Sequence, residues 1–476
     1  MAADAGVMME VGWMGAAELS AAYRAGTVSP VEVVRRLFER IDRLDPVVHA
    51  FILPDPEAAL AAARQAEQEL ARGRSRGPLH GVPVGIKDII DVAGLPTTCH
   101  SKILVGQVAA TDAAVVAKLR GAGAIVMGKL STHEFAIGGP IFDLPFPPAR
   151  NPWNPAHHPG GSSSGSGAGL AAGLFPLALG TDTGGSVRHP ASACGVVGLK
   201  PTYGLVSRRG VFPLAFTLDH VGPMARTVAD AALLLEAIAG HDPADPGSVA
   251  GPAGAYPGEL GRGVKGLRVG FVRHFHTSGL AGDQQADPEV AAALEDVAAV
   301  LAGQGAVVRE VTLPSLADFN VTNRVILHAE AWAIHADWLR TRPGDYGQAT
   351  RRRLMTGAFL SAGDYVQAQR RRLALIAAVD EAFREVDVLL TASSLDPAAA
   401  IEDWPEVERT YSRQARMPFN VTGHPAVAMM SGFSSAGLPL SVQFVGPAFA
   451  DGMVLRVAAA YEREAGWRGE RPGMAA

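Results

Sequence analysis

The segment around Ser186 is the part of this sequence that best fits nucleophilic chemistry. Ser186 follows Gly184 and Gly185 in the segment GTDTGGSVRHP, residues 180–190. Glycines at these positions leave the hydroxyl exposed and let backbone N–H groups point into one space, where they can stabilise the oxyanion of an acyl-transfer intermediate. A serine hydroxyl becomes a good nucleophile only when a base takes its proton. The pattern therefore indicates acyl transfer, provided that a base lies nearby.

Lys87 is a candidate for that base. It follows the apolar segment 82–86, which is expected to form a buried strand. A lysine can accept a proton only when it is neutral, and a desolvated position favours the neutral form by lowering its pKa. An ion pair with Asp88 or another carboxylate is the structural alternative, and Lys87 considered alone favours that alternative.

Two other segments resemble known catalytic or binding motifs but lack a feature that the motif requires. Residues 161–165 (GSSSG) match a nucleophile elbow, but the proline-rich residues 151–159 before them cannot form the central strand that an elbow requires. Residues 123–129 resemble a phosphate-binding loop, but Leu130 stands where a serine or threonine must bind magnesium. Neither an α/β-hydrolase nor a nucleotide-binding site is predicted.

No metal or cofactor is expected either. His133 and Glu134 would need a second histidine at position 137 to form a zinc-protease motif, and Ile137 stands there instead. The remaining histidine pairs are too close together or too isolated to build a metal shell, and they are interpreted as surface or packing residues. These pairs are His157 with His158 and His274 with His276.

Composition indicates an ordinary globular enzyme. The 476 residues are 48% hydrophobic and 19% charged, with a net charge of −5, which is enough apolar material for a large core. The arginine runs 351–353 and 370–372 are interpreted as solvated helix faces. We therefore expect no nucleic-acid partner.

The cysteines and the apolar segments indicate where the protein is expected to be located. Cys99 and Cys194 form no metal-ligand or disulfide pattern. Residues 1–14 lack the basic and long apolar regions of a signal peptide, and no uncharged apolar run is long enough to cross a membrane. A cytoplasmic protein without a membrane partner is expected.

Helix and strand patterns alternate along most of the chain, which predicts the α/β class. Helix starts are indicated by Ser29 before Pro30, by Thr227, by Asp287 before Pro288, and by the long periodic segment 362–383. Strands are expected at 82–86, 124–127, 267–272, 306–311, 386–390, 426–430 and 440–445, with a hairpin connection at 434–437. Inside the glycine-rich window 160–186, the apolar stretch 170–179 is compatible with a helix.

Five motifs, taken in order, resemble the amidase signature family. They are residues 81–88 (GVPVGIKD), 159–166 (PGGSSSGS), 180–186 (GTDTGGS), 195–204 (GVVGLKPTYG) and 437–443 (GLPLSVQ). The resemblance implies a single α/β domain over residues 1–476, with a central mixed β-sheet flanked by helices. It also implies core motifs in 81–230 and 417–467 and a variable pocket region at about 319–405.

The resemblance implies a Ser–cisSer–Lys triad. Ser186 maps to the nucleophile, Lys87 to the base, and Ser162 to a bridging serine in a cis peptide bond. Ser162 is chosen because it is the first serine after the paired glycines; Ser163 is the main rival, and Ser164 adjoins it.

Further site residues follow from the same resemblance. Arg188 can orient a substrate carbonyl or carboxylate, or it can form a structural ion pair with Asp182. The implied oxyanion hole consists of the backbone N–H groups of Thr183, Gly184, Gly185 and Ser186, and the expected substrate contacts are Ile137, Gly138, Gly139 and Arg188.

The sequence departs from the family pattern at four places. Ser164 replaces a glycine after the paired serines, a variant familiar in members that act on small amides and urea-like substrates. Met430 and Ala392 replace a common proline and a threonine-rich segment. Residues 406–416 form a charged, helix-like stretch, whereas the A subunit of tRNA-dependent amidotransferases is associated with a different segment there.

The expected activity is hydrolysis of a small-molecule amide C–N bond through an acyl-enzyme, with aryl or alkyl amides favoured. Carbamate or urea hydrolysis on the same site is one alternative, and the A subunit of a tRNA-dependent amidotransferase is another. The expected partner is a small-molecule amide or carbamate, with a homodimer as an option. Aromatic residues that could line an apolar pocket are Trp332, Trp338, Tyr346, Phe359, Tyr365 and Trp404.

Overall fold

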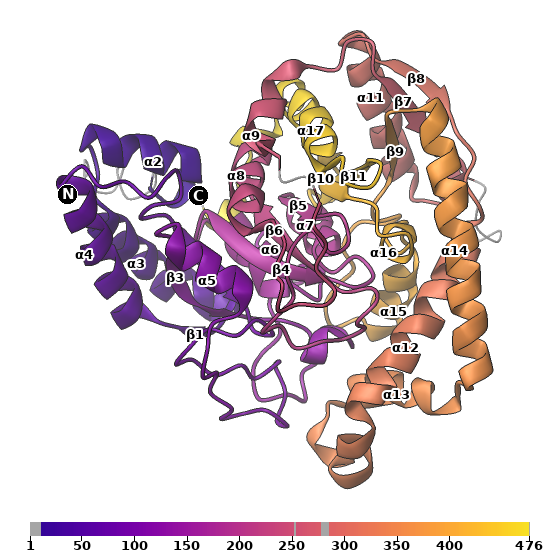
Figure 1. Ribbon diagram of the computed structural model, residues 1–476, viewed down its shortest axis with the longest axis horizontal. Coiled ribbons are helices and arrows are strands. Elements are labelled where there is room, and N and C mark those ends of the chain that lie inside the picture. The colour runs from indigo at the N-terminus through magenta and orange to yellow at the C-terminus, as the bar shows by residue number, and fades with distance from the viewer. Residues whose placement is uncertain (1–10, 252–253, 278–284, 476) are drawn as a thin grey trace.

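A computed structural model describes residues 11–251, 254–277 and 285–475. Within these ranges the centre of the molecule is one sheet of eleven strands, in the order β1-β3-β2-β4-β6-β5-β10-β11-β9-β7-β8 (Figure 1). In chain order the strands are β1 (Phe51–Pro54), β2 (Pro83–Lys87), β3 (Ile125–Leu130), β4 (Leu177–Asp182), β5 (Val197–Lys200), β6 (His220–Ala225), β7 (Arg268–Phe271), β8 (Val307–Glu310), β9 (Val388–Ala392), β10 (Ala426–Phe433) and β11 (Pro439–Val445).

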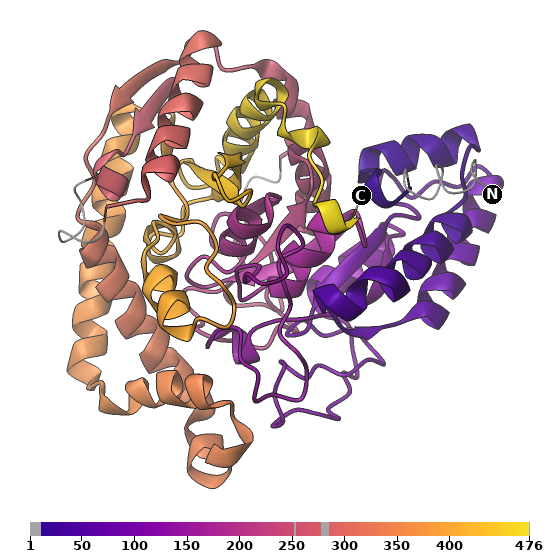
Figure 2. The same ribbon diagram turned by 180° about the vertical axis from the view of Figure 1, so that it is seen from behind.

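Helices flank this sheet, so the mixed α/β class predicted from the sequence is confirmed (Figures 1 and 2). The long helices α12 and α14 lie at the end of the molecule opposite α2 to α5. The helices are α2 (Ala16–Ala25), α3 (Pro30–Val48), α4 (Pro56–Ala71), α5 (Ala114–Gly121), α6 (Ser164–Ala171), α7 (Arg188–Cys194), α8 (Val228–Ile238), α9 (Tyr256–Glu259), α10 (His274–Thr277), α11 (Pro288–Gly303), α12 (Leu316–Thr341), α13 (Gln348–Met355), α14 (Ala362–Glu385), α15 (Trp404–Ser412), α16 (Pro418–Val421) and α17 (Asp451–Ala465).

The pairing of β2 with β4 positions the candidate site. β2 runs parallel to both β3 and β4, and every residue of β2 and β4 is buried. The carboxyl ends of parallel strands meet at the same edge of a sheet, where α/β enzymes commonly bind ligands. Lys87 is the last residue of β2 and Asp182 is the last residue of β4. The candidate base and the turn that holds the candidate nucleophile therefore lie at the same edge of the sheet.

Helix starts follow the local signals in the sequence. The Ser29 side chain accepts a hydrogen bond from the Glu32 N–H at the start of α3, and Thr227 and Asp287 cap α8 and α11 in the same way. Each cap satisfies an N–H group that has no partner within its helix. The predicted hairpin between β10 and β11 is also present, since these strands pair antiparallel across residues 434–437.

The stretch 170–179 differs from the helix-compatible interpretation. α6 ends at Ala171, Gly173 adopts a φ of +68°, and β4 begins at Leu177. A left-handed residue ends a helix, and glycine adopts that conformation without a steric penalty. β4 is buried on both faces, so its apolar run does not alternate and cannot be told from a buried helix by periodicity. The strands β1, β5 and β6 were likewise not predicted.

The end of the described chain packs beside the N-terminal helices (Figure 1). There the Arg40 guanidinium donates to the Ala475 carbonyl oxygen at 2.6 Å. The N-terminal residues 1–10, on which the expectation of no signal peptide largely depends, lie outside the described residues. Among the helices that are described, none combines the length and apolarity needed to cross a membrane.

Candidate active site

Lys87 lies fully buried at the end of β2. Its Nζ is 2.7 Å from the Ser162 Oγ and 2.8 Å from the Thr181 Oγ1. Burial lowers the pKa of Lys87 to about 7, although the negative charges of Asp182 and Asp219 act in the opposite direction. An amine with this pKa is substantially neutral near neutral pH, so it can accept a proton from a hydroxyl group.

Asp88 does not pair with Lys87. Its carboxylate Oδ1 lies 2.9 Å from the Nζ of Lys129, and both side chains are fully buried. Lys129 also donates to the Pro96 carbonyl and to the Thr97 hydroxyl. Thus the ion pair that was the structural alternative for Lys87 forms with a different lysine.

The two candidate relay serines have different partners. The Gly161–Ser162 peptide bond is cis, and the Ser162 hydroxyl contacts Lys87. The Ser163 hydroxyl instead donates to the Thr181 carbonyl and accepts from the Thr181 N–H, each at 3.2 Å. Ser163 therefore joins α6 to β4, whereas Ser162 is the serine that lies next to the candidate base.

Ser186 lies in the turn after β4 and is 6% exposed. Its carbonyl oxygen accepts from the Ser163 N–H at 3.1 Å, which places the two serine segments side by side. The Ser186 hydroxyl makes no hydrogen bond to any residue in the described ranges, so the contact from Ser162 to Ser186 is not formed here. Catalytic hydrogen bonds are often long before substrate binds.

Asp182 and Arg188 hold this turn. The Asp182 carboxylate accepts hydrogen bonds from the N–H groups of Gly185, Val187 and Arg188. It also pairs with the Arg188 guanidinium at 2.9 Å, and both side chains are fully buried. The charge of Arg188 lowers the pKa of Asp182 far below its usual range even though burial would raise it.

Arg188 has no donor left for a substrate. A guanidinium carries five N–H groups, and the five acceptors here are both Asp182 carboxylate oxygens, the Arg416 carbonyl, Gln443 Oε1 and Asn420 Oδ1. The tentative role of Arg188 as a substrate ligand is therefore corrected to the structural ion pair, because every donor already serves the protein.

The predicted oxyanion hole also needs a correction. The N–H of Gly185 donates to Asp182 Oδ1 at 2.7 Å and so cannot serve an oxyanion. Within the described ranges, the N–H groups of Thr183, Gly184 and Ser186 have no acceptor. Asn323 supports the turn from α12, since its side-chain amide donates to the Thr183 carbonyl at 3.2 Å.

Two of the expected substrate contacts, Gly138 and Gly139, lie against α13 and α15. Ile137 is buried and directly follows a short 3₁₀ helix, Glu134–Ala136. Gly138 has a φ of +111°, and a Cβ there would lie 2.6 Å from Thr350 Oγ1. A Cβ on Gly139 would meet the Trp404 ring at 3.0 Å. These contacts indicate close packing, and their role in substrate binding stays a prediction.

Several residues beside the turn were not found from the sequence. The Arg416 side chain packs against Gly185, and the buried His133 ring lies against Gly161. The Tyr411 ring lies near the His189 ring, with centroids 5.2 Å apart. Gly185 and Arg416 are far apart in the sequence, as are His189 and Tyr411. No local spacing therefore indicates that these residues meet.

The aromatic residues of the variable region do not form one pocket. Phe359 is 84% exposed. Trp338 and Tyr346 pack instead around Phe135, with ring centroids 6.0 and 5.6 Å from it. Of the two departures in the sheet, Met430 lies in β10 and Ala392 in β9, both buried, so they are part of the core of the sheet.

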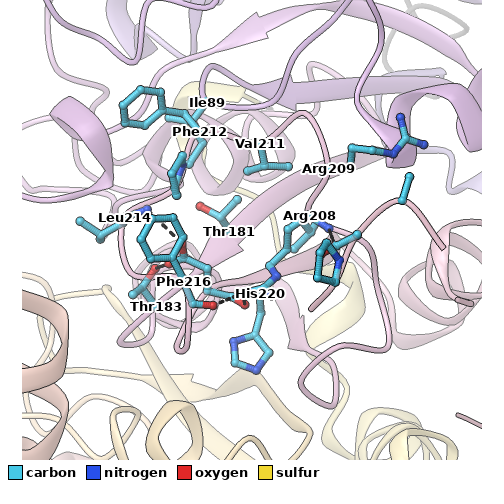
Figure 3. Close-up of a pocket in the computed structure, with 16 residues that line it drawn as sticks. Ile89, Thr181, Thr183, Arg208, Arg209, Val211, Phe212, Leu214, Phe216 and His220 are labelled. Carbon is cyan, nitrogen blue, oxygen red and sulfur yellow. Dashed lines mark hydrogen bonds between the residues drawn. The ribbon is translucent and has the colours of Figure 1, made fainter. Parts of the chain in front are cut away.

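A pocket of about 260 Å³ is lined in part by Thr181, the residue whose hydroxyl contacts Lys87. Thr181 and Thr183 contribute to it, with Leu214 and Phe216 near Thr183 and Arg209 toward the far end (Figure 3). Asp219 also lines this pocket and accepts from the Thr183 hydroxyl at 2.6 Å. Burial raises the pKa of Asp219 to about 6.

Comparison with known proteins shows the family of this chain. The family model described as Amidase matches residues 32–455. The A subunit of the glutamyl-tRNA(Gln) amidotransferase from Geobacter sp. (strain M21) is 41% identical, over 94% of this chain and 97% of that protein.

Solved structures are similar as well. One, described as a vestigial protein complex that reveals the evolutionary origins of an s-triazine catabolic enzyme, has a TM-score of 0.89 and 33% identity, covering 95% of this chain and 98% of that one. The peptide amidase from Stenotrophomonas maltophilia has a TM-score of 0.83 and 32% identity, covering 96% and 98%.

These relatives contradict one prediction. A small-molecule substrate without a nucleic-acid partner was expected, and the exclusion of nucleic acid depended on the net charge and on the interpretation of two arginine runs as solvated helix faces. The relative with 41% identity is, by its name, one component of a larger amidotransferase for a glutamyl-tRNA. Net charge does not predict a protein or nucleic-acid partner well, because it describes the whole surface. Such contacts depend on the charge of one local patch.

Proposed function

The chain belongs to the amidase family and acts on C–N bonds, and from that premise we propose that Ser186 cleaves an amide through an acyl-enzyme with Ser162 and Lys87 as its proton relay. The observation that carries this proposal is the 2.7 Å contact between a fully buried Lys87 and Ser162. A base without a carboxylate partner, in contact with the hydroxyl that it must deprotonate, is what activation of a serine requires.

The proposed reaction begins with proton transfer. Neutral Lys87 takes a proton from Ser162, which takes one from Ser186, and the Ser186 oxygen then bonds to the amide carbon. The free N–H groups of the turn stabilise the oxyanion. The C–N bond breaks as the relayed proton passes to the leaving nitrogen, and water attacks the resulting ester to release the acid.

We propose that the amide nitrogen released here serves a tRNA-dependent amidotransferase, in which this chain is the component that cleaves a donor amide. The support is the 41% identity to the corresponding component of such an enzyme over almost the full length of both chains. In this role the other components would use the released nitrogen on glutamyl-tRNA.

A second candidate is an amidase that acts without tRNA, on small amides, carbamates or ureas. Two observations favour it. Its structural likeness is high both to a peptide amidase and to a chain of the complex described as revealing the evolutionary origins of an s-triazine catabolic enzyme, with TM-scores of 0.83 and 0.89. The segment 406–416, expected to be unlike its counterpart in the amidotransferases, contains most of the helix α15 and, after it, Arg413, which pairs with Asp396 at 2.7 Å.

The test measures ammonia release from glutamine and from a panel of amides, carbamates and ureas, with the Ser186→Ala protein as control. A fluorophosphonate probe that labels wild type but not Ser186→Ala would identify the nucleophile. Amidotransferase function predicts that the chain copurifies from its native cells with partner proteins and amidates glutamyl-tRNA when they are present. Rapid hydrolysis of small amides by the isolated chain, without any stable partner, would favour the second candidate.

A further inference from the structure

Arg416 is a buried guanidinium beside the nucleophile turn. It is 2% exposed, and its side chain packs on Gly185, the residue before Ser186. Its backbone carbonyl accepts from Arg188, and its N–H donates to Gln414 Oε1. The main chain at Arg416 is therefore anchored, and this anchoring fixes where the guanidinium lies relative to the turn.

The Arg416 guanidinium has few hydrogen-bond acceptors among the described residues. One terminal nitrogen donates to the Ser394 hydroxyl at 2.6 Å, and Nε has no hydrogen-bond partner in the described ranges. No carboxylate among the described residues forms an ion pair with it. A buried cation without a counter-ion is costly, and such groups persist where something else supplies the missing charge.

The neighbouring charges do not supply it. Burial lowers the pKa of Arg416 and the negative charge of Asp182 acts to raise it, but the Asp182 carboxylate is already engaged by Arg188, Asn420 and three backbone N–H groups. The Arg353 guanidinium lies over the Tyr411 ring, 5.4 Å from its centroid, and Glu408 lies 3.9 Å from Arg353. Neither carboxylate therefore offers Arg416 a free counter-ion, because Asp182 serves Arg188 and Glu408 serves Arg352 and Arg353.

We propose that Arg416 binds an anionic group, such as a carboxylate, on the acyl part of the substrate. This inference rests on the proposed acyl-enzyme at Ser186 and narrows its substrate class to amides whose acyl chain carries a carboxylate. A planar carboxylate matches the fork of a guanidinium and would satisfy the unpaired Nε. Because Arg416 touches the residue before the nucleophile, this contact also sets the position of the scissile carbonyl.

The test compares two matched series of primary amides. Malonamate, succinamate and glutaramate carry a carboxylate, and propionamide, butyramide and valeramide have a methyl group in its place. Wild type should have the higher kcat/KM on the carboxylate series. Arg416→Gln should lose roughly 10- to 100-fold on that series, mainly through KM, and change little on the neutral series. Arg416→Lys should recover part of the loss.

Arg340→Gln is the matched control. Arg340 is an exposed arginine that pairs with Asp337 on α12, so this variant makes the same charge change away from the turn and should leave both series unchanged. Circular dichroism and thermal unfolding should show that Arg416→Gln is folded. Equal losses on the two series, or no preference of wild type for the carboxylate series, overturn the inference.

A second measurement does not depend on turnover. Glutarate should slow fluorophosphonate labelling of Ser186 in wild type and should not do so in Arg416→Gln; equal protection in both overturns the role of Arg416. Hydrolysis that depends on Ser186 but is confined to neutral amides overturns this inference and leaves the acyl-enzyme intact. Failure of Ser186 to label, with hydrolysis unaffected by Ser186→Ala, overturns both.

Discussion

Asp88 pairs with Lys129 at 2.9 Å, and this ion pair leaves the adjacent Lys87 without a carboxylate partner. Lys87 is the last residue of β2 and Asp88 lies in the turn that follows, so the two neighbours in sequence have different partners. A carboxylate in contact with Lys87 would raise its pKa. Its absence allows burial to hold that pKa at about 7, which is the property that a lysine base requires.

Removing Lys129 should expose the cost of the buried carboxylate. Lys129→Met leaves Asp88 charged and unpaired in the core, and we expect a loss of about 3–5 kcal/mol in the free energy of unfolding. The double variant Asp88→Asn/Lys129→Met should lose much less, because no uncompensated charge remains. Urea unfolding of the three proteins checks this. Equal stability of the single and double variants would contradict the ion pair's role.

Activity should depend on pH through Lys87. The base works only when it is neutral, so kcat/KM should fall about tenfold for each pH unit below the pKa of about 7 and level off above it. The profile is measured from about pH 5 to about pH 9. Asp219→Asn is the comparison, because Asp219 raises the Lys87 pKa, and its removal should move the acid limb to lower pH. A rate that stays flat down to about pH 5 is inconsistent with a lysine base.

Ser162 and Ser163 should separate catalysis from stability. Ser162→Ala removes the hydroxyl next to Lys87 and should lower kcat by about 10²–10⁴-fold, with little change in thermal stability. Ser163→Ala leaves the Thr181 N–H without its acceptor and should cost about 1–3 kcal/mol of stability with a smaller effect on kcat. Steady-state kinetics and thermal unfolding of both variants show which serine acts in catalysis and which stabilises the fold. The reverse pattern would make Ser163 the relay.

Arg188 should behave as a structural residue. Arg188→Met leaves Asp182 buried without its counter-ion and should cost about 3–5 kcal/mol in unfolding free energy. Its remaining activity should fall by the same factor on charged and neutral amides, because no Arg188 donor faces the substrate. Arg409→Met is the control: its pair with Glu406 is half exposed and should contribute at most about 1 kcal/mol. A selective loss on carboxylate-bearing amides in Arg188→Met would return Arg188 to the substrate site.

Much of the fold was predictable because its signals are local. Capping residues such as Ser29 and Thr227 act on N–H groups within three residues, and short apolar runs such as 440–445 mark strands by themselves. β4 was missed because a strand buried on both faces has no alternation, and the glycine that separates it from α6 resembles any other glycine in that window.

The residue types of the candidate site came from the chain alone: a glycine-framed serine, a serine after paired glycines and a lysine at a strand end. Their partners depended on packing. Contacts between residues 75 and 94 positions apart hold Lys87 against Ser162 and Thr181, and a contact across 228 positions joins Arg188 to Arg416. Which lysine keeps its charge, which N–H groups remain free and which arginine lacks a partner all depend on burial and on neighbours brought together by folding. These are properties of position in three dimensions, so no spacing along the chain could reveal them.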